Sequence, residues 1–152
     1  NWAIIPDVID GEVEQQRELI KKYSHLPKHL VAPVWHMSLS LDWLLEIANN
    51  YDRFCFGSSG AYWQVGSESW CRRADQAWNE LTKRGFKPWG HMMRGLALCG
   101  DIYPFASADS TNVARNFKNK GSETCPERMA RRIDSIQTPL KWTLREIQGS
   151  LL

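Results

Sequence analysis

The sequence predicts an α/β fold in which about five parallel strands alternate with helices, as in part of a (β/α) barrel of the TIM type with further helices at the C-terminal end. Two observations support this fold class. Short apolar runs alternate along the chain with helical patterns, which is typical of a parallel sheet built from β-α-β units. The apolar runs are almost continuously hydrophobic, as strands buried on both faces are.

The apolar runs expected to form strands span residues 2–6, 30–35, 53–56, 89–93 and 103–108. Helical spacing of apolar residues predicts helices over 12–23, 41–50, 68–84, 112–118, 127–136 and 140–148, and a short turn or helix at 96–101. Ser40 is an N-cap residue type before the second helix, and Ser67 or Glu68 opens the third, which Gly85 ends. We expect a half-barrel α/β domain over residues 1–118. Residues 119–152 should form a loop and helical extension of it.

The composition is that of an ordinary globular protein, with 43% hydrophobic and 24% charged residues among 152. The net charge of +2 indicates no strong electrostatic partner, although it rises from −3 over residues 1–50 to +3 over residues 109–152. Eight tryptophans are many for this length, and tryptophan serves cores, interfaces and base-stacking surfaces alike.

The four cysteines, Cys55, Cys71, Cys99 and Cys125, are too widely spaced for a zinc motif, so we expect no metal site and no cofactor. No apolar run reaches the roughly 18 residues of a membrane span, and no signal peptide is visible. These features predict a cytoplasmic protein with reduced cysteines and no membrane partner. Because the chain opens on Asn1 inside an apolar run, we expect a fragment, a processed chain or a trimmed one.

Polar or glycine residues follow each expected strand: Asp7, His36, Gly57, His91 with Arg94, and Asp109. In a parallel sheet these ends share one edge, where α/β barrels keep catalytic groups. A doubly wound sheet is the alternative, but the glycine-rich phosphate-binding turn usual there is missing.

Each of these residues also has a structural interpretation. Asp109 lies among N-cap residue types and would simply cap a helix, and Asp7 would stabilise a turn. His36 and His91 are acid–base groups, metal ligands or hydrogen-bonded structural residues. Arg94 holds a phosphate or forms an ion pair. Tyr62 and Trp63 would either stack on a base or pack in a core or interface. Three arginines form a basic helical face that would contact either nucleic-acid phosphates or solvent: Arg128, Arg131 and Arg132.

Four short motifs occur in a suggestive order: IIPD at 4–7, FCFGSSG at 54–60, HMMRGL at 91–96, and FASADS at 105–110 followed by Ala-Arg at 114–115. Together they resemble the C-terminal half of the tRNA-guanine transglycosylase barrel. They look closest to the phage and bacterial relatives that place deazaguanines in DNA. The resemblance covers roughly residues 2–117.

The resemblance implies a base-exchanging glycosyltransferase that acts on a purine in tRNA or DNA and inserts a 7-deazaguanine-like base. Asp109 matches the family's nucleophile, and a carboxylate is a competent nucleophile at an anomeric carbon. Asp7 matches the residue that reads the base edge, and the backbone of Gly57, Ser58 and Ser59 matches the base-contacting turn. The remaining substrate-binding candidates lie within or near the matching motifs: His36, near the family's glutamine position, His91, Arg94 and Ser110.

Two departures leave alternatives open. The strand that carries the family's general-base aspartate and the family's cysteine-rich zinc site have no counterpart here, and five strands do not close an eight-stranded barrel. We therefore expect a homo-oligomer or a missing N-terminal half. The second interpretation is a catalytically inactive half-barrel that serves as a nucleic-acid-binding or assembly module. The third is an unrelated barrel enzyme for a phosphorylated metabolite, held by Arg94 and the turn at 107–112.

Overall fold

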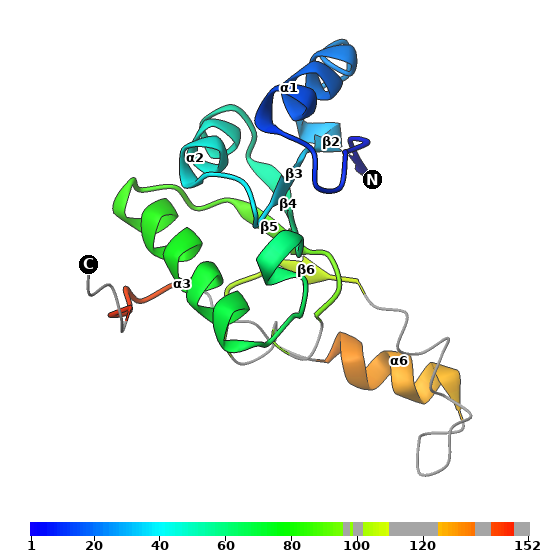
Figure 1. Ribbon diagram of the computed structural model, residues 1–152. Helices are drawn as coiled ribbons and strands as arrows, with labels where there is room; N and C mark the ends of the chain where they lie inside the picture. Colours follow the sequence, from blue (N-terminus) through cyan, green and yellow to red (C-terminus); the bar gives the residue numbers. More distant parts are fainter. Residues whose placement is uncertain (96–97, 99–101, 110–124, 136–140, 148–152) are drawn as a thin grey trace.

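The computed structural model describes residues 1–95, 98, 102–109, 125–135 and 141–147 (Figure 1). Its strands are short and overlap the predicted runs, although β3 and β4 each extend one residue further: β1 (Ala3–Ile4), β2 (Val31–Ala32), β3 (Val34–His36), β4 (Arg53–Gly57), β5 (Trp89–Met92) and β6 (Ser107–Ala108). The helices are α1 (Val13–Lys22), α2 (Leu41–Asn50), α3 (Glu68–Lys83) and α6 (Pro126–Asp134), with 3-10 turns η1 (Lys28–Leu30) and η2 (Gly60–Tyr62).

Every strand pair in the described residues is parallel, which confirms the α/β class. One sheet has the order β1-β2 and the other β3-β4-β5-β6, so spatial order follows sequence order. Pro33 separates β2 from β3 because it has no N–H to donate to a ladder, and the predicted strand 30–35 therefore splits in two. Sequential parallel strands joined by helices are the arrangement that brings all strand ends to one edge.

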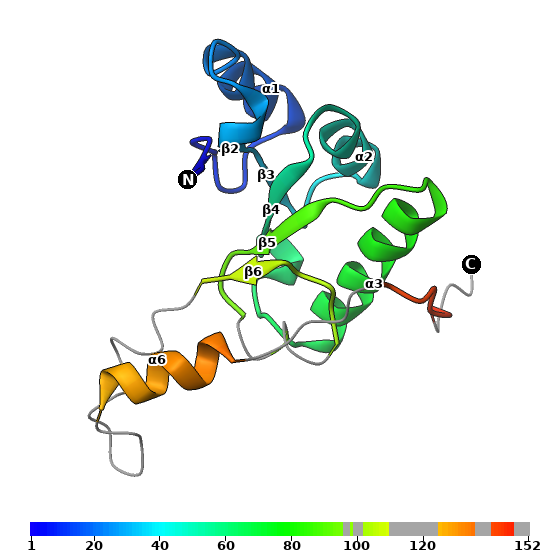
Figure 2. The same cartoon turned by 180° about the vertical axis from the view of Figure 1, so that it is seen from behind.

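Helices α2 and α3 lie on the same side of the four-stranded sheet, while α1 lies apart beside β2 (Figures 1 and 2). The sheet face beneath α2 and α3 is aromatic. Trp35, Phe56 and Met92 occupy one row across β3, β4 and β5, and all three are fully buried. The Phe56 ring stacks on Trp78 of α3, with ring centroids 5.3 Å apart. This apolar layer fixes the sheet against its helices.

The helix starts follow the predicted chemistry. The Ser40 hydroxyl accepts the Trp43 N–H at 3.2 Å, and the Ser67 hydroxyl accepts the Trp70 N–H at the same distance. Each bond satisfies one of the backbone donors that a helix start leaves unpaired. Gly85 ends α3 at a φ of 78°, a conformation that favours glycine.

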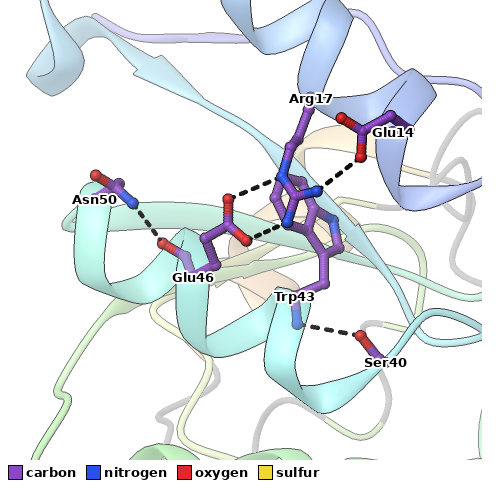
Figure 3. A network of polar contacts seen from close by, with 6 residues as sticks. All are labelled: Glu14, Arg17, Ser40, Trp43, Glu46 and Asn50. Atoms are coloured by element: carbon purple, nitrogen blue, oxygen red, sulfur yellow. Dashed lines mark hydrogen bonds and ion pairs between the residues drawn. The ribbon is translucent and has the colours of Figure 1, made fainter.

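Helix α1 is joined to α2 by a polar network around Arg17 (Figure 3). The guanidinium donates two hydrogen bonds to the Glu46 carboxylate and a third to Glu14, and it lies over the Trp43 ring at 5.2 Å. These contacts hold the pKa of Arg17 above its usual value and that of Glu46 below it, because each side chain stabilises the charged form of the other.

The C-terminal helix predicted at 140–148 is wrong for the described residues 141–147, which form no helix. The buried Asn79 of α3 holds this segment instead. Its side chain accepts hydrogen bonds from Trp142 Nε1 at 2.8 Å and from the Arg145 N–H at 3.0 Å, and donates one to the Arg145 carbonyl. Tertiary bonds to the backbone replace the helical ones.

The predicted strand at 103–108 is confirmed only for Ser107 and Ala108. Tyr103 and Phe105, which precede this short strand, are buried against the rings of α3. The helix predicted at 112–118, most of the turn predicted at 96–101 and the domain boundary at 118 lie outside the described residues. Among the helices that are described, none combines the length and the apolar character needed to cross a membrane.

Candidate functional site

The sheet face opposite α2 and α3 carries the polar candidates. Strand pairing aligns Val34, Cys55, His91 and Ser107 in one row across β3, β4, β5 and β6. Side chains alternate between faces along a strand, so this row points away from the aromatic layer. His36, two residues beyond Val34, is on the same face and nearer the carboxyl edge.

Asp7 and His36 form a tight pair at this edge. His36 Nε2 lies 2.7 Å from Asp7 Oδ2, the imidazole is 5% exposed and the carboxylate 22%. His36 Nδ1 is buried and, among the described residues, has no hydrogen-bond partner. The ring lies directly over Gly57, where an added Cβ would come within 2.9 Å of Nδ1. Glycine is therefore needed at this position of β4 so that the imidazole can approach the strand.

Asp109 follows β6 and is fixed by the turn after β5. The Arg94 N–H donates to Asp109 Oδ1 at 2.6 Å. Arg94 has a φ of 63°, a conformation that side-chain-bearing residues rarely adopt. The Arg94 guanidinium also donates to the Ser58 carbonyl at 3.3 Å, which ties the turns after β4 and β5 together. The Asp109 side chain stays 54% exposed, so the fixed carboxylate remains accessible.

His91 lies between Asp109 and Ser107. Its Nδ1 is 2.6 Å from the Ser107 hydroxyl, and its Nε2 is 3.8 Å from Asp109 Oδ2. The ring stacks on Trp89 at an interplanar angle of 6° and meets Trp2 edge to face. Burial lowers the pKa of His91, and the Asp109 carboxylate opposes that shift only in part. Burial thus favours the neutral imidazole over the imidazolium.

Cys55 lies in the centre of this face and is an unreactive thiol. Burial raises its pKa to about 12, and the negative charges of Asp109 and Asp7 add to the effect. A thiol with this pKa is not a nucleophile at neutral pH.

The turn at 57–60 has its main chain available to a ligand, because its serine hydroxyls form hydrogen bonds with other side chains of the protein. Ser58 Oγ accepts a hydrogen bond from Trp70 Nε1 at 2.9 Å, and Ser59 Oγ is 2.9 Å from Ser38 Oγ. Both serines are buried. Any contact that this turn makes with a ligand would therefore come from the main chain.

The structure thus brings Asp7, His36, Gly57, Ser58, Ser59, His91, Arg94 and Asp109 to one face or edge. Ser110 lies outside the described residues. Tyr62 packs against Arg73, whose guanidinium is 5.5 Å from the ring, while Trp63 is 67% exposed. Among the described residues, no three His, Cys, Asp or Glu side chains gather closely enough to hold a metal ion.

Sequence reasoning did not predict that Trp2, Trp89 and Ser107 contact His91, and it placed Ser107 only in the candidate phosphate-binding turn at 107–112. The signal that could have found two of them is the period of two along a strand. Trp89 precedes His91 by two residues and Ser107 precedes Asp109 by two, so each shares a face with its neighbour. Trp2 precedes β1 of the other sheet, and its contact with His91 joins residues far apart in the chain, which a local sequence pattern does not show.

The chain matches no family model, no curated protein and no solved structure.

Proposed function

We propose that the chain is a base-exchanging glycosyltransferase of the transglycosylase type, which acts on a purine nucleotide in tRNA or DNA with Asp109 as the nucleophile. In this proposal the parallel strands form part of the wall of a (β/α) barrel. The observation that carries the proposal is the state of Asp109: one carboxylate oxygen is held at 2.6 Å by a backbone N–H, while the side chain stays more than half exposed. A nucleophile needs both orientation and access.

The proposed reaction has two displacements. Asp109 Oδ2 attacks the ribose anomeric carbon, and the purine leaves with the electron pair of the glycosidic bond. The resulting glycosyl ester on Asp109 is then attacked by the ring nitrogen of a 7-deazaguanine-like base, which loses its proton, and the carboxylate is released. This is the double displacement that retaining glycosidases use.

Asp7 would read the incoming and leaving bases. Its Oδ2 already receives a hydrogen bond from His36, which fixes the plane of the carboxylate. In the described part of the chain, Oδ1 has no hydrogen-bond partner and remains able to accept N–H groups from a guanine-like edge. The backbone at 57–59 lies beside this pair and would contact the base. The hydroxyls of Ser58 and Ser59 already form hydrogen bonds within the protein.

Incorporation of radiolabelled guanine into unfractionated tRNA and into plasmid DNA tests the proposal. Asp109→Asn should abolish incorporation. Asp52→Asn is the matched control, because Asp52 is an exposed carboxylate at the opposite end of β4. Incorporation into neither nucleic acid by the unaltered chain, or equal incorporation by Asp109→Asn, would contradict the proposal. Light scattering on the same sample tests whether a homo-oligomer completes the barrel, which a mass near 17.6 kDa would contradict.

A catalytically inactive nucleic-acid-binding module is the second candidate, and the exposure of Trp63 favours it. An indole that is 67% exposed on the loop after β4 is a surface on which a base can stack. In this case Trp63→Ala should weaken tRNA or DNA binding by about 1–3 kcal/mol. Asp109→Asn should bind as tightly as the unaltered chain, and neither should exchange bases.

A further inference from the structure

The hydrogen bond between Ser107 and His91 orients a ring that faces the proposed nucleophile. His91 Nδ1 is 2.6 Å from Ser107 Oγ, which is close to the shortest hydrogen bonds found in proteins. Trp89 stacks on the imidazole and Trp2 packs edge-on against it. The ring is therefore fixed in its plane and in its rotation, and its second nitrogen points toward Asp109.

The charge of Asp109 favours one tautomer of this ring. A carboxylate accepts hydrogen bonds and repels a lone pair, so the nitrogen nearest to Oδ2 should carry the proton. Nδ1 then has a lone pair and accepts the Ser107 O–H. The Ser107 hydroxyl therefore donates its hydrogen bond to His91 Nδ1, and the N–H of His91 Nε2 points toward Asp109 Oδ2.

The distance between Nε2 and Oδ2, 3.8 Å, exceeds that of a hydrogen bond. Oδ2 is consequently attracted but not bound, whereas Oδ1 is bound by the Arg94 N–H at 2.6 Å. Among the described residues, the carboxylate thus has one anchored oxygen, Oδ1, and one oxygen without a hydrogen bond, Oδ2. A charged imidazolium would close the gap, because charge-assisted N–H···O bonds are about 2.7–2.9 Å long.

We propose that His91, held by Ser107, is the positioning residue of the Asp109 carboxylate: as a neutral ring it aligns Oδ2 across the gap, and on protonation it binds this oxygen and switches the nucleophile off. This inference rests on the proposed function and adds to it an acid-sensitive control of the same site.

Other charged and titratable groups on this face do not duplicate the role. Cys55 neighbours His91 on β4 and stays a neutral thiol, since its pKa is raised to about 12. Arg53 lies over the rings of Trp89 and Trp2, at 4.7 and 5.3 Å, so the aromatic rings separate it from the imidazole. Asp7 is paired with His36, and the Arg94 guanidinium with the Ser58 carbonyl. Asp109 is therefore the charge that responds to His91.

An NMR titration of the histidine rings tests the contact without requiring any activity. The His91 ring should carry its proton on Nε2 and titrate below 6.5, the ordinary value of histidine. Asp109→Asn should lower the His91 pKa further, because the carboxylate that stabilises the imidazolium is removed. Ser107→Ala should change the tautomer ratio. An unchanged His91 titration in Asp109→Asn, with Asp52→Asn as the control, would overturn the inference.

The pH profile of guanine incorporation tests the control of the nucleophile. The rate should fall on the acid side with the midpoint of the His91 titration. In His91→Gln the side-chain amide reaches toward Asp109, whereas in His91→Asn it reaches only toward Ser107. His91→Asn should therefore be the slower of the two variants. Its rate of incorporation should be on the order of 10²-fold below that of the unaltered chain. Both variants should lose the acid limb. If His91→Gln still loses activity at acid pH as the unaltered chain does, this inference is contradicted. If the unaltered chain incorporates no guanine, the proposed function is contradicted. In that case the NMR titration alone tests the contact between His91 and Asp109.

Discussion

The two histidine–aspartate pairs on the sheet both have a buried imidazole, but they differ in the distance between the partners and in the exposure of the carboxylate. His36 and Asp7 are 2.7 Å apart, and the carboxylate is 22% exposed. His91 and Asp109 are 3.8 Å apart, and the carboxylate is 54% exposed. Within the described part of the chain, the carboxylate is the one hydrogen-bond partner of the first histidine, while the second is also held by Ser107 on its other nitrogen.

The two geometries suit different tasks. A closed hydrogen bond fixes the plane of the Asp7 carboxylate, which suits the recognition of a flat ligand edge. An open contact leaves a carboxylate oxygen free to form a bond, while a backbone N–H keeps the group in place. The same two residue types thus give a reading site and a reacting site, depending on the distance between them.

Substitution of the two carboxylates should change different kinetic constants, and this difference should be the largest of those predicted. Asp109→Asn should lower kcat for guanine incorporation on the order of 10⁴-fold, because the other described carboxylate of this edge, Asp7, is paired with His36 and does not replace the nucleophile. Asp7→Asn should mainly raise KM, since it alters recognition of the base. Steady-state kinetics on tRNA and on plasmid DNA measure both. A large loss of kcat in Asp7→Asn with little change in Asp109→Asn would reverse the assignment.

The two pairs should also differ in their contribution to stability. Asp7→Ala removes the hydrogen-bond partner of a buried imidazole whose other nitrogen is already unpaired, which costs about 1–3 kcal/mol. Asp109→Ala removes an exposed side chain and should cost less, about 0.5 kcal/mol. Urea unfolding of both variants measures the free energies. Equal losses of unfolding free energy in the two variants would show that the closed pair does not stabilise the fold more than the open pair does.

Acid should destabilise the chain through His91. Because its pKa in the folded chain lies below the ordinary value of 6.5, the unfolded chain binds the proton more readily. The free energy of unfolding is then fully maintained above pH 6.5 and falls as the pH drops from 6.5 through the folded pKa. Urea unfolding at several pH values measures this loss. It should be smaller in His91→Asn, and a loss of equal size in that variant would assign the acid sensitivity to other groups.

The smallest effect is expected away from both pairs, at the junction of α1 and α2. Arg17→Met removes the bonds to Glu46 and Glu14 but keeps an apolar stem over Trp43 (Figure 3). Because these charges are exposed, the melting temperature should fall only slightly, and less at high salt. Guanine incorporation should be unchanged. A change in incorporation would show that α1 orients the loop that carries Asp7.

Local chemistry explains which elements could be predicted. Helix α2 begins after Ser40 and spans Leu41–Asn50 as predicted, because an N-cap hydroxyl and an apolar stripe both depend only on neighbouring residues. The segment after Lys141 has a helical pattern too, yet Asn79, more than 60 residues earlier, binds its backbone instead. A partner so distant leaves no mark in a local pattern.

The candidate site divides in the same way. The strand ends with Asp7, His36, His91 and Asp109 could be predicted, because parallel strands bring their carboxyl ends to one edge. The distances that distinguish the two pairs could not, since they depend on how Gly57 admits the His36 ring and on the unusual backbone at Arg94. Pairwise geometry of this kind is set by packing and not by composition.

The most direct measurement is to trap the covalent intermediate. The chain is mixed with unfractionated tRNA or plasmid DNA, denatured before the second displacement, digested and mapped by mass spectrometry. The account predicts a nucleotide adduct on the peptide that contains Asp109, and none in Asp109→Asn. An adduct on another residue, or one that persists in Asp109→Asn, would contradict the assignment of Asp109 as the nucleophile.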